Sequence, residues 1–158
     1  MRVADITVRE ARQDEQGAIF PLLLLAEPSA SALRWSLKNL SDTAYVLEHD
    51  GRLAGAATMR FRREPCEVVE LAVAKELQGR GLGRHFLGRL IEEARRRGKP
   101  EVFLGTSSTS AGNIIFYQKC GFRVHEVRPD YFWYYDRPVY EHGILVRDMI
   151  VLRHDLAV

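Results

Sequence analysis

A glycine-rich turn lies near the middle of the chain, between a segment rich in valine and leucine and a segment with helical periodicity. It reads Gln78-Gly79-Arg80-Gly81-Leu82-Gly83. Glycines let a backbone come close to a ligand, successive amide N–H groups can point at an anion, and a helix N-terminus adds about half a positive charge. The pattern favours a phosphate site, although a helix start that is glycine-rich for other reasons would look the same.

Two common phosphate-binding motifs do not fit this turn. A Walker loop ends in Gly-Lys-Ser/Thr, whereas Gly83 is followed by Arg84 and His85. A dinucleotide fingerprint requires Gly-x-Gly-x-x-Gly, and counted from Gly81 its last position is Phe86. A phosphate-bearing ligand of another class is therefore expected.

The residues around the turn resemble the GNAT family of N-acetyltransferases. The resemblance rests on Leu71-Ala72-Val73, the Gln-x-x-Gly-x-Gly motif, Ala111-Gly112-Asn113, and Phe116-Tyr117-Gln118-Lys119-Cys120-Gly121-Phe122. It covers nearly the whole chain, and segment 141–150 is similar to a bacterial stand-alone subgroup whose substrates are poorly defined. It implies a mixed α/β (α+β) GNAT fold with a central sheet of about six to seven strands, helices on both faces, and a splayed strand pair at the acetyl-CoA site.

The resemblance implies an acetyl-CoA-dependent N-acetyltransferase. Main-chain groups of the turn would bind the pyrophosphate of acetyl-CoA, and main-chain groups of the preceding strand would bind its pantetheine arm. The residues implied in coenzyme binding are Leu71, Ala72, Val73, Gln78, Gly79, Arg80, Gly81, Leu82, Gly83, Arg84, Asn113 and Tyr117. Asn113 also fits a helix-start residue that bonds to its own backbone.

Transfer of acetyl to a primary amine poses two proton problems. The amine arrives mostly protonated at neutral pH, and the departing thiolate gains from a nearby acid. Tyr117 matches the family's acid position, and a phenol with a pKa of about 10 is a suitable neutral donor; a packed aromatic residue would give the same pattern. We expect direct attack in a ternary complex, with the oxyanion stabilised by a main-chain N–H near Val73.

Glu67 and Glu70 are the candidates for the base. Glu67 matches the strand position where several family members carry a base, so the resemblance favours it. The two residues are three positions apart on an expected strand, so their side chains are predicted to point to opposite faces, with only one facing the acetyl group. Ordered water is an alternative base, and Glu70 would then be a buried partner of an arginine.

An aromatic segment follows the sixth expected strand: Tyr131 to Tyr135, and Tyr140, with acidic residues beside them. It could wall an amine pocket by cation–π contacts and charge. A dimer interface or a packed cover fits equally well. The acceptor could be a small-molecule amine, an amino acid or a protein amine, and the acidic character of the segment favours a small cationic amine.

Hydrophobic periodicity predicts alternating strands and helices. Strands are expected over 3–9, 43–47, 53–61, 66–74, 101–106, 122–127 and 144–152, and helices over 14–26, 32–40, 82–97 and 111–119. Asp14 is the expected N-cap of the first helix. Asp50-Gly51 predicts a hairpin turn.

Composition predicts one soluble domain over residues 1–158. The 23 Lys and Arg nearly balance 21 Asp and Glu, which disfavours nucleic acid as a partner. No apolar run could span a membrane, and the N-terminus lacks signal-peptide character, so a cytoplasmic location is expected.

Cys66 and Cys120 are expected to be reduced thiols, and the five histidines have no metal-ligand spacing, so no metal is expected. The expected partners are acetyl-CoA and an amine, with a homodimer left open. The alternative function is a non-catalytic acyl-CoA-binding sensor.

Overall fold

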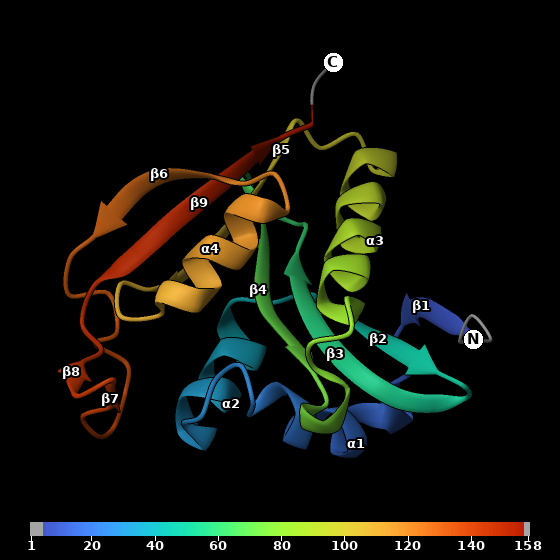
Figure 1. Cartoon of the computed structure of the whole chain (residues 1–158), viewed down its shortest axis with the longest axis horizontal. Helices are drawn as coiled ribbons and strands as arrows, with labels where there is room; N and C mark the ends of the chain where they lie inside the picture. The colour runs from blue at the N-terminus through green and yellow to red at the C-terminus, as the bar shows by residue number, and fades with distance from the viewer. Residues whose placement is uncertain (1–4, 157–158) are drawn as a thin grey trace.

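A seven-stranded mixed sheet organises the computed structural model, which describes residues 5–156 (Figure 1). The strand order is β1-β2-β3-β4-β5-β9-β6. The strands are β1 (Ile6–Glu10), β2 (Thr43–His49), β3 (Arg52–Arg60), β4 (Cys66–Val73), β5 (Glu101–Ser107), β6 (Arg123–Arg128) and β9 (Met149–Asp155). β4 and β5 are parallel, and the other neighbouring pairs are antiparallel. The predicted mixed sheet is confirmed; positions 3 and 4 of its expected first strand lie outside the described residues.

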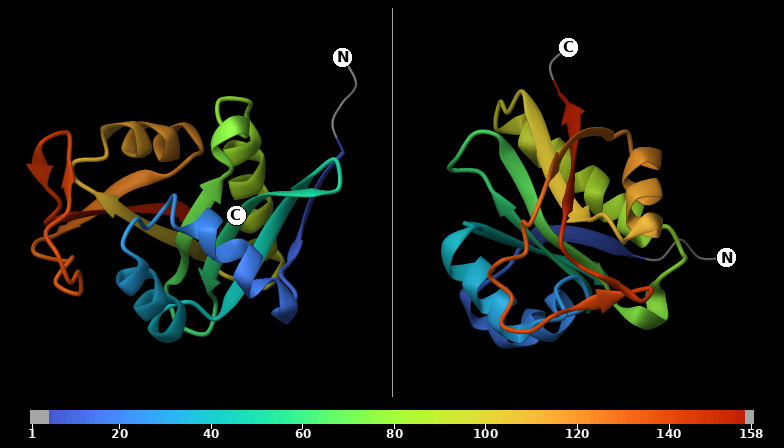
Figure 2. Two further views of the ribbon diagram at one scale, coloured as in Figure 1. Left: turned by 90° about the horizontal axis from the view of Figure 1, so that it is seen from below. Right: turned by 90° about the vertical axis from the view of Figure 1, so that its left-hand side faces the viewer.

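Helices cover both faces of the sheet (Figures 1 and 2). The helices are α1 (Gln16–Leu23), α2 (Ala30–Asn39), α3 (Leu82–Arg96) and α4 (Ala111–Lys119). Val46 packs in one apolar cluster with residues of α1 and α2, whereas its neighbour Leu47 packs in another with residues of α3. Adjacent strand residues point to opposite faces, so the two clusters lie on opposite sides of the sheet.

The apolar stripe predicted on the third helix is fully buried. Its residues are Phe86, Leu87, Leu90, Ile91 and Ala94, and each is at most 7% exposed. They recur at helical spacing, so they all face the sheet when the segment is helical. The stripe fixes the orientation of α3, and with it the direction in which the first turn of the helix points.

β4 and β5 separate part-way along their length. Their parallel register runs from Cys66 opposite Val102 to Val68 opposite Leu104 and then stops. β4 continues to Val73 and β5 to Ser107, and the two strands diverge toward the side where α2 lies (Figure 1). The predicted splayed strand pair is therefore present, and it exposes one main-chain edge of β4.

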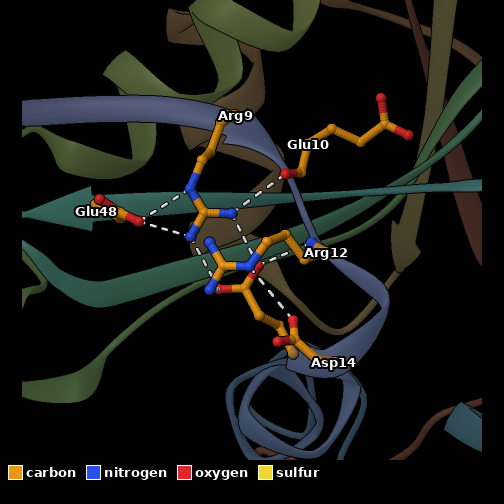
Figure 3. Close-up of polar contacts among 6 residues, drawn as sticks. Arg9, Glu10, Arg12, Asp14 and Glu48 are labelled. Atoms are coloured by element: carbon orange, nitrogen blue, oxygen red, sulfur yellow. Dashed lines mark hydrogen bonds and ion pairs between the residues drawn. The ribbon is translucent and has the colours of Figure 1, made fainter.

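An arginine fixes the turn from β1 into α1 (Figure 3). Arg9 lies 2.8 Å from a carboxylate oxygen of Glu15 and 2.6 Å from one of Glu48 on β2. The hydrogen bond from Arg9, with that from the Arg12 amide, lowers the pKa of Glu15 to about 2. Glu15 ends a 3-10 helix, η1 (Gln13–Glu15), and is the N-cap of α1. The prediction of Asp14 as N-cap is wrong because this extra turn precedes the helix.

The prediction of one strand over 144–152 is also wrong for the first half of that range. Residues Ile144–Leu145 form β8, which pairs with β7 (Tyr140–Glu141) in a separate small hairpin. His142 and Gly143 both have positive φ, so the chain reverses there. β9 begins only at Met149. Apolar residues on both sides of Arg147 look continuous in sequence, but they belong to two different sheets.

Both cysteines of the chain, Cys66 and Cys120, are free thiols, as predicted. Within residues 5–156, none of the helices combines the length and apolar character needed to cross a membrane.

Candidate functional site

The glycine-rich turn forms a cradle of backbone N–H groups at the start of α3. Gly79 and Gly81 have φ of +79° and +82°, in the left-handed region that glycine adopts without strain. The first hydrogen bond of the helix runs from the amide of His85 to the carbonyl of Gly81 at 3.1 Å. The amides before it therefore have no acceptor within the helix. Open N–H groups at the positive end of a helix suit a phosphate.

The side chain of Gln78 holds this cradle against the end of β4. Its Nε2 donates to the carbonyl oxygen of Val73 at 3.0 Å. A 3-10 helix, η2 (Lys75–Leu77), forms the connection between them. The cradle is thus fixed relative to the open edge of the splayed strand, so one ligand can contact both.

A cavity of about 920 Å³ runs from the cradle into the splay. Most of the residues predicted to bind coenzyme line it: Leu71, Ala72, Val73, Gln78, Gly79, Gly81, Gly83, Arg84, Asn113 and Tyr117. Arg80 and Leu82 do not line it: Arg80 is exposed and Leu82 is buried in the core. A cavity of this size and length suits an extended ligand with a phosphate end.

Tyr117 reaches the cavity from α4. Its ring contacts Phe116 and Phe122, with ring centroids 5.3 Å and 6.2 Å away. Burial raises the pKa of Tyr117 to about 12, so the phenol stays protonated at neutral pH. Tyr117 lines the cavity, so its hydroxyl is placed where a ligand could reach it.

Asn113 lies on the first turn of α4, at the cavity wall and exposed. Its Nδ2 donates to Oγ1 of Thr106 at 3.4 Å. This bond joins α4 to β5. The side chain of Asn113 therefore does not bond to its own backbone, which was the alternative expectation.

Glu67 and Glu70 lie on the same face of β4, so the prediction that they point to opposite faces is wrong. Glu67 pairs with Arg60 of β3 and Glu70 pairs with Thr58. Two steps on β3 therefore match three steps on β4, because the register shifts beside Val69. This β-bulge adds one residue to β4 and reverses the alternation of side chains. Both carboxylates line the cavity.

Glu70 is the more deeply buried of the two carboxylates, at 7% exposed. Its oxygens accept hydrogen bonds from Oγ of Ser36 on α2 and Oγ1 of Thr58, each at 3.0 Å. Burial outweighs these bonds and raises the pKa of Glu70 to about 7. A carboxylate poised near neutral pH is suited to take a proton. Glu67 is also raised in pKa by burial, and the Arg60 guanidinium, 3.7 Å away, opposes the shift.

The aromatic segment closes the far end of the cavity. Tyr131, Phe132, Tyr134 and Tyr135 line it, and Trp35 of α2 stacks on Tyr134 with centroids 4.9 Å apart. The segment passes close to α2 in Figure 2. The sequence left open whether this segment walls a pocket, forms an interface or is a packed cover. The first alternative fits these four residues, whereas Trp133 remains 72% exposed.

Two further acidic residues make contacts in this region: sequence reasoning missed Glu27, whereas Glu141 is one of the acidic residues noted beside the aromatic segment. Glu27, between α1 and α2, lines the cavity and accepts a hydrogen bond from the Tyr135 hydroxyl at 2.9 Å. Glu141 accepts from Oγ1 of Thr109 at 2.7 Å, just before α4. These contacts join segments far apart in the chain, and no local pattern signals them. Among the described residues, no cluster of histidine, cysteine and acidic side chains could hold a metal ion.

Replacing Gly81 by alanine is expected to weaken acetyl-CoA binding about tenfold, because a left-handed alanine costs about 1–2 kcal/mol. A Cβ there would meet no atom within 4 Å, so any effect comes from the backbone alone. Gly88→Ala is the matched control: it lies on α3 with equally open space and an ordinary helical φ. Calorimetric titration measures both dissociation constants. Equal affinities in the two variants would contradict the role of the turn.

The chain is similar to known proteins in both sequence and structure. The family model described as acetyltransferase (GNAT) family matches residues 7–122. The uncharacterized N-acetyltransferase YvbK of Bacillus subtilis is 34% identical over 158 residues, covering 99% of each chain. A GNAT family acetyltransferase from Elizabethkingia anophelis with acetyl-CoA bound superposes with a TM-score of 0.85 at 29% identity, over 95% of this chain and 97% of that one. A Bacillus subtilis acetyltransferase in complex with CoA superposes with a TM-score of 0.79 at 33% identity, over 97% and 99%.

Proposed function

The chain belongs to the GNAT family of acetyltransferases, and from this premise we propose that it transfers the acetyl group of acetyl-CoA to a primary amine. The observation that carries the proposal is a single cavity that joins three features. These are the open N–H groups of the turn, the unpaired edge of β4, and lining side chains that include both a protonated tyrosine and a carboxylate with a pKa near 7.

The fit to acetyl-CoA is supported by the cradle and the splay together. The left-handed Gly79 and Gly81 keep the turn open, and a Cβ at either position would find empty space rather than packed neighbours. The unpaired edge of β4 offers main-chain donors and acceptors to an amide-bearing arm. In this proposal the turn binds the pyrophosphate, and the strand from Leu71 to Val73 binds the pantetheine arm.

Bound acetyl-CoA supplies a thioester whose carbonyl carbon the amine nitrogen attacks in a ternary complex, so that a C–N bond forms and the C–S bond breaks. We assign Glu70 as the group that takes the proton leaving the nitrogen, directly or through water, since burial brings its pKa to about 7. Tyr117 donates a proton to the departing sulfur. Glu67, held beside Arg60, shapes the acceptor end. Holding both substrates together in one cavity contributes much of the rate.

The test is a calorimetric titration with acetyl-CoA followed by a thiol-release screen over a panel of primary amines. We expect binding, and thiol release that depends on both acetyl-CoA and one class of amine. Binding without release for any small or protein amine would instead favour a non-catalytic acyl-CoA sensor. Absence of binding would overturn the proposal, because the cradle carries most of its weight.

A further inference from the structure

A small side pocket adjoins the acceptor end of the cavity. Its volume is about 140 Å³, and it shares Glu67, Gly105 and Met149 with the main cavity. It lies where β3, β4, β5, β9 and β6 run side by side. Three arginines also line it: Arg60, Arg63 and Arg128. A polar recess with three guanidinium groups next to an acidic site suggests a place for an anion.

Arg60 is the most buried of the three arginines that line the side pocket. Its side chain is only 17% exposed, and its nearest carboxylate oxygen, on Glu67, lies 3.7 Å away, beyond hydrogen-bond distance. A guanidinium carries five N–H donors, and one carboxylate can engage at most two of them. Arg60 therefore has donors left for a planar carboxylate, which a guanidinium binds with two parallel bonds.

Two of the other charged residues around the side pocket are paired within the chain, and Arg63 is exposed. Arg128 lies 2.8 Å from a carboxylate oxygen of Glu126. Glu64, which could have neutralised Arg60, lies 3.1 Å from Nζ of Lys99. Arg60 is thus a partly buried positive charge whose carboxylate partner, Glu67, lies at the long distance of 3.7 Å.

Tyr131 lines the main cavity and is affected by charges from both the side pocket and the proposed base. Burial is the main cause of the raised pKa of this phenol, and the charges that act on it are those of Glu67 and Glu70, which raise it, and of Arg128 and Arg60, which lower it. Positive and negative groups therefore surround one side chain of the cavity wall. A ligand lying against Tyr131 could place an ammonium group by the glutamates and an anionic group by Arg60.

We propose that the acceptor is an amino acid or a close analogue: a primary amine whose carbon skeleton also carries a carboxylate, which Arg60 binds in the side pocket. This inference rests on the proposed acetyl transfer and narrows its acceptor. The acidic residues that line the cavity, Glu67 and Glu70 among them, suit a cationic nitrogen. A purely cationic amine would bring a second positive charge near Arg60, whereas the carboxylate of an amino acid would offset that charge.

The experiment compares amines that differ only by the carboxylate, such as phenylalanine with 2-phenylethylamine, methionine with 3-(methylthio)propylamine, and lysine with cadaverine. Each is titrated into the protein saturated with CoA, so that binding is measured without turnover, and each is then assayed by thiol release. We expect at least one amino acid to bind and react about 10- to 100-fold better than its decarboxylated partner, the range for a charge-assisted hydrogen-bonded contact.

Arg60→Met tests the assigned residue. It should weaken binding and turnover of the amino acid more than those of the decarboxylated amine, with the affinity for acetyl-CoA unchanged. Arg62→Met is the matched control, since Arg62 is exposed and lies outside the side pocket. Arg60→Lys, which keeps the charge, should restore part of the preference, and thermal midpoints verify that all variants fold.

Two results would overturn the inference. One is that no amino acid binds better than its decarboxylated partner, and the other is that Arg60→Met weakens both members of each pair equally. Loss of the proposed function is seen separately, as failure to bind acetyl-CoA or to release thiol with any amine. Turnover of decarboxylated amines alone would keep the acetyltransferase and reject the amino acid.

Discussion

Replacing Tyr117 by phenylalanine is expected to lower kcat by about 10²- to 10³-fold, the contribution of a general acid. The dissociation constant for acetyl-CoA should stay within about twofold, because the ring and its contacts with Phe116 and Phe122 are kept. Only the hydroxyl is removed. That hydroxyl has a pKa of about 12, so in the native protein it carries its proton through the whole working range of pH.

The measurement is steady-state thiol release, with calorimetry for the coenzyme. Tyr140→Phe is the matched control, because Tyr140 also lines the cavity but belongs to the aromatic segment and is 65% exposed. It should change kcat little. A Tyr117→Phe enzyme with the native kcat would show that the sulfur leaves without help from this phenol. Loss of acetyl-CoA affinity together with kcat would instead assign Tyr117 a binding role.

The elements of this fold follow from local patterns. The amphipathic stripe of α3 is visible in sequence because its five apolar residues recur at helical spacing, and all of them are buried. The β2–β3 turn is visible in sequence because Asp-Gly is a common pair in two-residue hairpins. Both central residues of such a turn need positive φ, and Asp50 and Gly51 adopt it. Even the splay of β4 was expected from the resemblance, and the register bears it out.

The side chains of the acceptor end could not be placed in the same way. The bulge at Val69 is a property of the β3–β4 pairing rather than of β4 alone, so alternation along the strand put Glu67 and Glu70 on opposite faces. Glu27 meets Tyr135 over a separation of 108 residues. Arg60 stands at the end of an expected strand, where nothing in sequence distinguishes it from its exposed neighbours Arg62 and Arg63. Position in the fold, rather than residue type, gives these groups their role.

Replacing Glu70 by glutamine is expected to lower kcat by about 10²- to 10⁴-fold and to change its pH profile. In the native enzyme the rate should fall as the pH drops below about 7, because Glu70 then holds a proton and cannot accept another. The variant should lack this acidic limb. Glu67→Gln is the matched control on the same strand and face, and it should keep a limb near pH 7. A limb that survives in the Glu70 variant and disappears in the Glu67 variant would transfer the role of base to Glu67.

Stability provides a second readout that does not depend on turnover. The folded-state pKa of Glu70, about 7, lies above the ordinary value of 4.5, so the folded protein binds a proton that the unfolded chain has lost between these two pH values. The free energy of unfolding should therefore decrease as the pH rises from 4.5 to 7, by on the order of 3 kcal/mol at most. In Glu70→Gln this decrease should be absent, so the variant gains stability relative to the native protein between pH 5 and pH 8. Denaturant unfolding at those two pH values measures the difference. If the free energy of unfolding changed with pH in the same way in both proteins, Glu70 would ionise in the folded protein as it does in water. Burial would then not explain how it could act as a base.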